Sequence, residues 1–176
     1  MPFITPSSVR KTPEDPNWME TFSHRPELLD AWIVLLGCIK IRMQPLRYEL
    51  VTVAAAMALK SSYCALAHGS VLRDHLSDDE ILAILRVGPT DPLDREIMAF
   101  ARAIVLDASA IRAEDTDRLR NAGLEDAEIC DIAAAAAARC FFSKYVDALG
   151  AEPDAVYAGL PEALRIALTP GRPIAV

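Results

Sequence analysis

Residues 47–68, with the sequence RYELVTVAAAMALKSSYCALAH, decide the fold of this chain. The segment is rich in alanine, valine and leucine, which predicts helices with buried faces. It also carries a carboxylate, a hydroxyl, a thiol and an imidazole, and each of these groups costs free energy to bury unless it is paired. Their presence in a core-like segment therefore indicates a functional site, formed by Glu49, Ser61, Cys64 and His68.

Apolar residues at three- and four-residue spacing extend the helical pattern to both sides of this segment. Prolines at helix starts, and serine or aspartate just before a helix, mark the boundaries. We expect helices over residues 26–41, 46–59, 62–75, 77–87, 93–107, 113–121 and 124–149. No segment shows the sustained alternation of a β-strand, so the predicted fold class is all-α.

The chain has 176 residues, a length that suits one domain with a substantial core. Prolines are frequent near the start, where they remove backbone donors and block helix formation. They predict an extended N-terminal arm over residues 1–20. We expect a single helical domain over residues 21–160, followed by a peripheral, proline-containing C-terminal tail over residues 161–176.

One short stretch is repeated within the chain. Residues 45–50, PLRYEL, are similar to residues 92–97, PLDREI. The match suggests internal duplication of a helical unit. It is equally well explained by the chemistry that helix starts share, because proline and acidic residues are both favoured there.

Composition and charge exclude several classes of function. The net charge of −7 disfavours nucleic acid as a partner, because phosphate binding requires clustered lysine and arginine. The first residues lack the apolar core of a secretory signal, and the apolar run over residues 31–39 is too short to cross a membrane. We therefore expect a cytoplasmic protein with no membrane partner. Hydrophobic residues make up 52% of the chain, and part of this excess is expected to form subunit contacts.

The four cysteines follow neither a disulfide pattern nor a zinc pattern. They are scattered through helical segments, and no CxxC motif occurs. His68 and His75 cannot share a metal ion on a straight helix. Seven residues rise about 10 Å along the axis, whereas zinc ligands lie about 2 Å from the ion. We expect no metal and no cofactor.

Cys64 and His68 are four residues apart, so their side chains share one face of a helix. Cys64 also falls in the first turn after Ser61, where free backbone N–H groups favour an anion. Both features stabilise a thiolate, which is the reactive form of cysteine. Glu49 can orient His68, or relay its proton, if the preceding helix folds back onto this one. The alternative interpretation makes Cys64 an inert buried thiol, Glu49 a helix-start charge and Tyr63 a packing aromatic.

The spacing of these residues resembles a family motif. The motif is Glu-x11-Cys-x2-Cys-x3-His, of the alkylhydroperoxidase D-like branch of the carboxymuconolactone decarboxylase superfamily, and the chain matches it except at Ser61. The resemblance extends over residues 26–155 and includes PLRYEL before the alanine-rich helix and LGAEPD near the end. It implies an all-helical, oligomeric protein with a site at or near a subunit interface. It also implies reduction of peroxides, with Cys64 as the nucleophile and Glu49 and His68 as a proton relay.

The serine at position 61 changes what the resemblance implies. In that family the first motif cysteine forms the disulfide that resolves the oxidised nucleophile, and a hydroxyl cannot form a disulfide. An oxidised Cys64 would therefore stop at sulfenic acid until another thiol reacted with it. Ser61 remains a candidate to cap the helix and to donate a hydrogen bond to the Cys64 sulfur. Tyr63 is a further candidate for the pocket.

We therefore expect an oligomeric, antioxidant oxidoreductase with peroxidase activity of the peroxiredoxin type. Its partners are expected to be a small-molecule hydroperoxide, an external thiol reductant and further copies of the same chain. Two alternatives stay open. One is a non-redox, decarboxylase-like enzyme that performs acid–base chemistry on a lactone or small organic acid. The other is a catalytically silent member that serves in binding or assembly.

Overall fold

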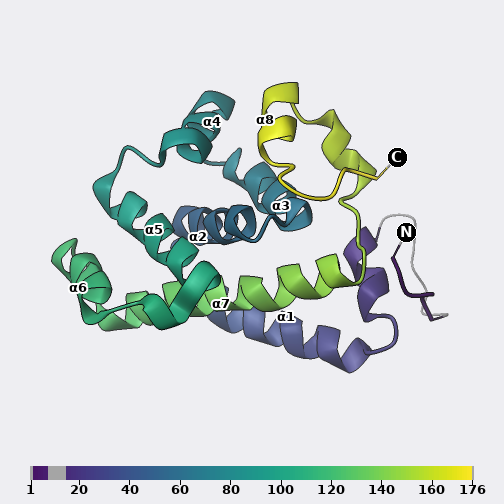
Figure 1. The fold of residues 1–176 in the computed structure, drawn as a ribbon, viewed down its shortest axis with the longest axis horizontal. Helices are drawn as coiled ribbons and strands as arrows, with labels where there is room; N and C mark the ends of the chain where they lie inside the picture. The colour runs from purple at the N-terminus through teal and green to yellow at the C-terminus, as the bar shows by residue number, and fades with distance from the viewer. Residues whose placement is uncertain (1, 8–14, 176) are drawn as a thin grey trace.

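The structure, a computed structural model, describes residues 2–7 and 15–175 and is all-helical (Figure 1). Within the described residues no β-strand occurs. The α-helices are α1 (Pro26–Lys40), α2 (Pro45–Ala58), α3 (Ser62–Leu72), α4 (Asp78–Val87), α5 (Pro92–Asp107), α6 (Ala113–Asn121), α7 (Asp126–Ala148) and α8 (Glu162–Ala167). Three short 3-10 helices are η1 (Asn17–Phe22), η2 (Ala108–Ala110) and η3 (Ala155–Gly159). The predicted all-α fold class is confirmed, and each expected helix is present with small shifts at its ends.

Helix α2 occupies the middle of the fold, in contact with α3, α5 and α7. Its residues 48–56 are all buried, and the alanines among them let neighbouring helices approach closely. The helix start is fixed locally. Pro45 occupies the first helical position, and the Gln44 side chain accepts a hydrogen bond from Arg47 N at 2.8 Å. This central position carries Glu49 into the core.

A capping box sets the start of α4. Ser77 Oγ accepts a hydrogen bond from Glu80 N at 3.3 Å, and Glu80 Oε2 accepts one from Ser77 N at 2.8 Å. At the other end of α4, Gly88 takes a φ of 89°, a conformation that favours glycine. Local side-chain chemistry therefore sets both ends of this helix.

The two copies of the repeated stretch lie side by side, because α2 packs along α5. Arg47 Nε donates to Asp94 Oδ1 at 3.2 Å, and these two residues occupy the same position in the two copies. The contact holds the two helix starts together. Duplication of a helical unit stays a prediction.

Aromatic residues anchor the chain that precedes α1. The ring centroids of Trp18 and Phe22 lie 5.2 Å and 6.1 Å from that of Phe142 on α7. The predicted extended arm over residues 1–20 is therefore wrong at its end, where η1 is helical because its rings bury against α7. Residues 8–14 of that arm lie outside the part of the chain that the structure describes.

The prediction of a peripheral C-terminal tail is also wrong. Leu164 and Leu168 are fully buried, and α8 packs on α4. Leu168 lies so close to α3 that a Cβ atom added at Gly69 would come within 2.5 Å of it. Gly171 N then donates to Ser62 Oγ at 2.8 Å, at the start of α3. The tail thus completes the core around the helix that carries Cys64.

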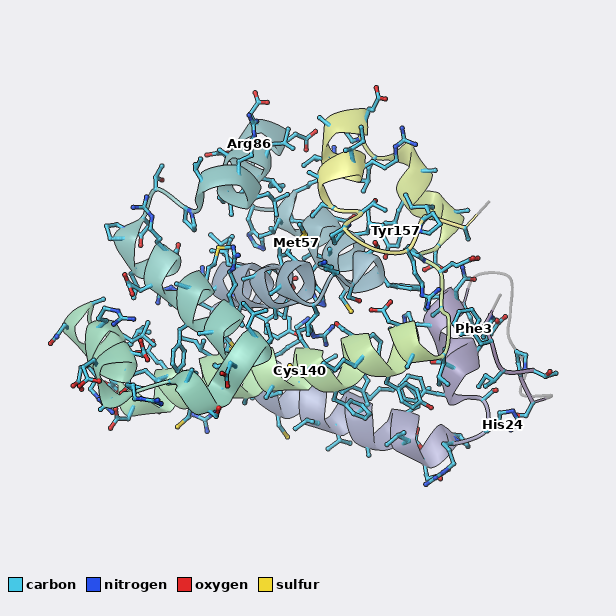
Figure 2. The ribbon with its side chains drawn as sticks, viewed as in Figure 1. Phe3, His24, Met57, Arg86, Cys140 and Tyr157 are labelled. Carbon is cyan, nitrogen blue, oxygen red and sulfur yellow. The ribbon has the colours of Figure 1, made fainter. Side chains whose placement is uncertain are left out.

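The two ends of the described chain also meet beside α7. Phe3, labelled in Figure 2, lies near the end of α7. Its N donates to Leu149 O at 2.8 Å, and the Arg172 guanidinium lies 4.7 Å from the centre of its ring. Both ends therefore pack on the same helical body. No helix in the described ranges is long and apolar enough to cross a membrane.

We expect Leu168→Ala to lower the free energy of unfolding by about 2–5 kcal/mol, because the substitution leaves a cavity at a fully buried position. The matched control is Ile166→Ala, at a side chain that is 66% exposed. It should change the free energy of unfolding by about 0.5 kcal/mol or less. Urea denaturation followed by circular dichroism measures both. Equally small effects would mean that the tail is peripheral after all.

Candidate active site

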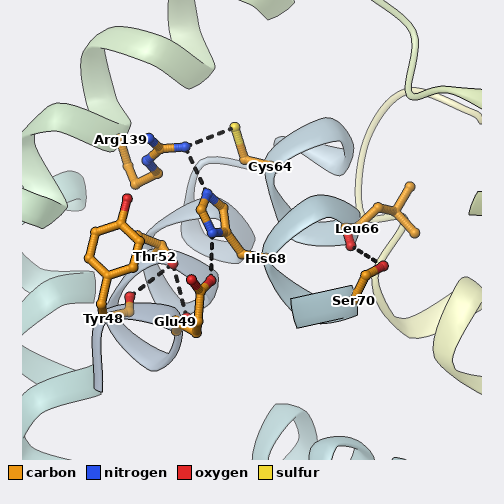
Figure 3. A network of polar contacts seen from close by, with 8 residues as sticks. All are labelled: Tyr48, Glu49, Thr52, Cys64, Leu66, His68, Ser70 and Arg139. Atoms are coloured by element: carbon orange, nitrogen blue, oxygen red, sulfur yellow. Dashed lines mark hydrogen bonds and ion pairs between the residues drawn. The ribbon is translucent and has the colours of Figure 1, made fainter. Parts of the chain in front are cut away.

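Helices α2, α3 and α7 bring the candidate site residues together (Figure 3). Cys64 lies in the first turn of α3 and His68 one turn later, as their spacing predicts. Glu49 reaches this region from α2, and Arg139 from α7. The alanine-rich stretch before Arg139 allows α7 to pack closely on α2.

Glu49 holds the His68 ring in place. Glu49 Oε2 lies 2.6 Å from His68 Nδ1, and the two side chains are only 6% and 17% exposed. A hydrogen bond to a carboxylate is strong in such low-dielectric surroundings. The imidazole is therefore fixed in orientation by a carboxylate from the neighbouring helix.

Arg139 lies between the thiol and the imidazole. Its Nη1 is 3.0 Å from His68 Nε2 and 3.8 Å from Cys64 Sγ. Because a guanidinium can only donate, His68 Nε2 must accept and therefore carries no proton. The proton of the neutral ring is then on Nδ1, where it is donated to Glu49. The network assigns a single tautomer to His68.

Burial lowers the pKa of His68 below its ordinary value, and the positive charge of Arg139 acts in the same direction. The hydrogen bond that His68 donates to Glu49 opposes the shift, but burial outweighs it. His68 therefore stays neutral to a lower pH than a free histidine does. A neutral ring next to an arginine is the state that this geometry requires.

The free energy of unfolding is expected to fall as the pH drops below about 6.5, the ordinary pKa of histidine. In that range the unfolded chain binds a proton at His68 and the folded chain does not, so protonation favours unfolding. The decrease should be smaller in His68→Gln than in the wild type. Urea denaturation at pH 7.5 and 5.5 tests this, with His75→Gln, at an exposed residue, as the control. An equal decrease in the free energy of unfolding in the wild type and in His68→Gln would contradict the prediction.

Cys64 is a buried, hydrogen-bonded thiol. It is 1% exposed, and its Sγ accepts a hydrogen bond from Ser143 Oγ at 3.1 Å. Arg139 Nη1 is the second donor, at 3.8 Å. The sulfur therefore has two hydrogen-bond donors, one of them charged.

Two aromatic rings hold the Arg139 guanidinium. Its central carbon lies 5.0 Å from the centre of the Trp32 ring and 5.1 Å from that of Phe142. The residue is 3% exposed, and its Nε has no hydrogen-bond partner among the described residues. Arg139 also forms no ion pair with a carboxylate among the described residues. A buried cation without a carboxylate is costly, so Arg139 relies on the two rings, His68 Nε2 and the Cys64 sulfur for its contacts.

The structure corrects the expected role of Ser61. It is the N-cap residue of α3, but its side chain makes no capping hydrogen bond, and its buried Oγ has no partner in hydrogen-bond geometry. The hydroxyl lies instead near Asp147. Burial raises the pKa of the Asp147 carboxyl, and the Ser61 hydroxyl partly offsets this rise. Ser143, from α7, provides the hydroxyl donor that had been expected from Ser61.

Tyr63 makes its contacts with Asp154 and Tyr157. Its hydroxyl donates to Asp154 Oδ2, and Asp154 Oδ1 accepts from Asn17 N at 2.7 Å. Its ring meets that of Tyr157 at 6.4 Å between centroids. Tyr63 therefore links the start of α3 to η1 and to the segment after α7. These contacts give it a structural role beside the site.

Sequence reasoning missed Arg139 and Ser143. Both are on α7, one turn apart, so they share a face. The sequence did contain a signal. Arg139 directly follows six alanines, and a single charged residue at the end of such an apolar helical run indicates a specific role for that charge. The contact of these two side chains with residues of α3 could not be derived from spacing.

The other cysteines lie apart from this network. Cys38 and Cys130 are exposed, Cys140 is half-buried, and all are free thiols. Among the described residues, no group of three histidine, cysteine or acidic side chains is arranged to hold a metal ion. The site is therefore built from one thiol, one imidazole, one carboxylate, one guanidinium and one hydroxyl.

These features define an all-helical bundle with a buried thiol site. No protein-family model and no curated protein matches the sequence, but solved structures match the fold. A peroxidase-related protein from Silicibacter sp. TM1040 is 25% identical, with a TM-score of 0.73 over 82% of this chain and 79% of that one. An alkylhydroperoxidase core protein from Ralstonia eutropha JMP134 is 24% identical, with a TM-score of 0.72 over 81% and 78%. The chain has the alkylhydroperoxidase D-like fold.

A further match has another activity. The debrominase Bmp8 is 20% identical, with a TM-score of 0.67 over 88% of this chain and 82% of that one. The same helical fold therefore occurs in proteins with more than one chemistry. The reaction must be argued from the site.

Proposed function

We propose that this chain is a thiol-dependent hydroperoxide reductase with Cys64 as its nucleophile. The observation that carries the proposal is the pair of donors on the Cys64 sulfur, Ser143 Oγ at 3.1 Å and Arg139 Nη1 at 3.8 Å. A cation and a hydroxyl around a buried sulfur stabilise the thiolate over the thiol. The similarity in fold to peroxidase-related proteins supports the same reaction class.

In the first step the Cys64 thiolate attacks the terminal oxygen of the hydroperoxide. The O–O bond breaks, and its electron pair stays on the other oxygen, which takes up a proton and leaves as an alcohol. Cys64 keeps the transferred hydroxyl as a sulfenic acid. The sulfur is thereby oxidised by two electrons, and the peroxide is reduced by two.

His68 and Glu49 supply the proton for this step. In the proposal, Arg139 Nη1 shifts its donation from His68 Nε2 to the Cys64 sulfur, and His68 Nε2 then receives the thiol proton and later gives it to the leaving alkoxide. Glu49 accepts from Nδ1 at 2.6 Å and stabilises the imidazolium while it exists. Arg139 cannot take a proton itself, so it acts as a fixed charge beside the sulfur.

An external thiol completes the cycle. It attacks the sulfenic acid, water leaves, and a mixed disulfide forms on Cys64. A second external thiol then releases Cys64 and leaves as a disulfide with the first one. Ser61 occupies the position of the resolving cysteine in the alkylhydroperoxidase D-like motif, so in this proposal an external thiol takes the place of that cysteine. Such a cycle fits the reducing cytoplasm.

The test is to expose the protein to cumene hydroperoxide in the presence of dimedone, a sulfenic-acid probe. Mass spectrometry should find the probe on Cys64 in the wild type and in Cys140→Ser, and nowhere in Cys64→Ser. Absence of the probe from Cys64 at neutral and alkaline pH would overturn the proposal. Lactone turnover that survives Cys64→Ser but not His68→Ala would favour an acid–base enzyme instead. No labelling of Cys64 and no lactone turnover would favour a role in binding or assembly.

A second candidate reaction uses the same thiol on a brominated aromatic compound. A cysteine-to-alanine variant of debrominase Bmp8 has been solved in complex with 2,3,4-tribromopyrrole. It is 22% identical to this chain, with a TM-score of 0.67 over 87% and 81%. The test is bromide release from tribromopyrrole. Release that requires both added thiol and Cys64, and that is faster than hydroperoxide reduction, would favour this reaction.

A further inference from the structure

A groove that is both apolar and basic lies between the end of α4 and the exposed face of α5. Its volume is about 520 Å³, which is in the range of pockets that hold small molecules. Apolar residues of both helices line it, with Leu85 from α4 and Met98, Ala99 and Leu106 from α5. Leu106 is 67% exposed, so apolar surface in the groove is left uncovered by the described chain. The groove is separate from the candidate active site, because no residue of that site lines it.

Three arginines line the same groove, and no acidic residue does. They are Arg86 on α4 and Arg95 and Arg102 on α5. Among the described residues none of the three pairs with a carboxylate, whereas Arg73 and Arg118 on the neighbouring helices both do. The chain as a whole has a net charge of −7. The groove is therefore a local region of positive charge on an acidic protein, and such a region attracts anions.

Arg95 is fixed in position by the turn between the two helices. Its Nε and Nη2 donate to Pro89 O at 3.1 Å and 2.8 Å. Gly88 brings this turn close to the arginine, and a Cβ atom added at Gly88 would lie 3.9 Å from the Arg95 side chain. Arg95 Nη1 makes no hydrogen bond within the part of the chain that the structure describes. It is a donor already held at the groove, so a ligand that binds it pays little of the usual ordering cost.

Local structure explains Arg86 and Arg95 but not Arg102. Arg86 lies in the last turn of α4, and Arg95 donates to a carbonyl just beyond it. Both interact favourably with the negative end of the helix dipole. Arg102 is seven residues after Arg95, so it lies on the same face of α5 about 10 Å farther along the axis. It has neither a carbonyl nor a carboxylate partner among the described residues. Two long side chains at this separation can both reach one anion placed between them.

We propose that this groove binds a monocarboxylate with an unbranched apolar tail. The carboxylate lies between Arg95 and Arg102, and the tail lies along Met98, Ala99 and Leu106. The lining decides the chemical class. A small inorganic anion leaves the apolar surface uncovered, and an uncharged apolar molecule leaves the guanidinium groups without an anion. The proposal does not rest on the chemistry of Cys64.

The experiment compares three ligands on the whole chain. Octanoate has both the charge and the tail, 1-octanol has the tail alone, and acetate has the charge alone. Ligand-observed NMR titrations measure the dissociation constants. We expect a dissociation constant on the order of 1 mM or tighter for octanoate, and binding about tenfold weaker or less for the other two ligands. No binding of octanoate at about 10 mM would overturn the proposal. So would 1-octanol or acetate binding as tightly as octanoate.

Two variants test whether octanoate binds in the groove. Arg102→Gln removes one of the two cations, and Ala99→Phe fills the apolar part. Each should raise the dissociation constant on the order of tenfold, because a charged hydrogen bond or the space for the tail is lost. Both positions are exposed, so both variants should fold, which circular dichroism checks.

Lys144→Gln is the matched control, because it makes the same change in net charge at an exposed residue of α7 outside the groove. It should leave the dissociation constant of octanoate unchanged. Octanoate binding that both groove variants leave intact would place the ligand elsewhere and contradict the proposal. An equal loss of binding in Lys144→Gln and Arg102→Gln would also contradict it, because binding would then depend on net charge alone.

Discussion

Arg139→Met is expected to slow the oxidation of Cys64 by a hydroperoxide on the order of 10²-fold, the usual cost of removing one donor from a developing anion. Arg139 Nη1 is the charged donor on the sulfur, and methionine removes both the charge and the hydrogen bond. Methionine is unbranched and apolar, like the stem of arginine, but it does not reach as far as the guanidinium. The rate of dimedone labelling after a hydroperoxide pulse measures the effect. The rate of alkylation of Cys64 by iodoacetamide at pH 7 measures the thiolate directly.

Two further variants separate charge from packing. Arg139→Lys keeps the positive charge but loses the planar group that donates to both Cys64 and His68, so it should recover part of the rate. Arg102→Met removes an exposed arginine of α5 and should change nothing. Because the buried cation has no carboxylate partner, Arg139→Met should still fold. An unchanged alkylation rate in a folded Arg139→Met would refute the role given to this residue.

The parts of the fold that the sequence predicted are those with local causes. The start of α2 follows from Pro45, and the start of α4 follows from the capping box of Ser77 and Glu80. Each of these signals lies within a few residues of the boundary it sets. The C-terminal tail was misjudged because Leu164 and Leu168 are buried by α3 and α4, which are far away in the sequence.

The same distinction applies to the site. Cys64 and His68 share a helix, so their common face could be read from their spacing. Arg139 is 71 positions from His68 and 75 from Cys64, and Ser143 is 79 from Cys64. Only the packing of α3 and α7 on α2 brings them together. The sequence therefore predicted a thiol next to an imidazole, whereas the structure inserts a guanidinium between them.

Glu49→Gln is expected to lower the rate of hydroperoxide reduction by about 10²–10⁴-fold, as when a carboxylate that fixes a histidine tautomer is replaced by its amide. A glutamine can turn its amide nitrogen toward His68 Nδ1 and donate to it. That contact favours the tautomer with the proton on Nε2, where it would point at the Arg139 donor. His68 would then lose either the unprotonated Nε2 that acts as the base or the fixed orientation of its ring. Steady-state turnover of cumene hydroperoxide with excess thiol measures the loss.

Glu96→Gln is the matched control, because Glu96 pairs with Arg118 at the surface of α5, away from the site. It should keep full activity. Glu49→Asp keeps the charge but shortens the reach to His68, so its rate should fall between those of the wild type and Glu49→Gln. If Glu49→Gln reduced hydroperoxide at the wild-type rate, Glu49 would be only a structural partner of His68. Cys64 would then rely on Arg139 and Ser143 alone, and proton transfer would have to come from water.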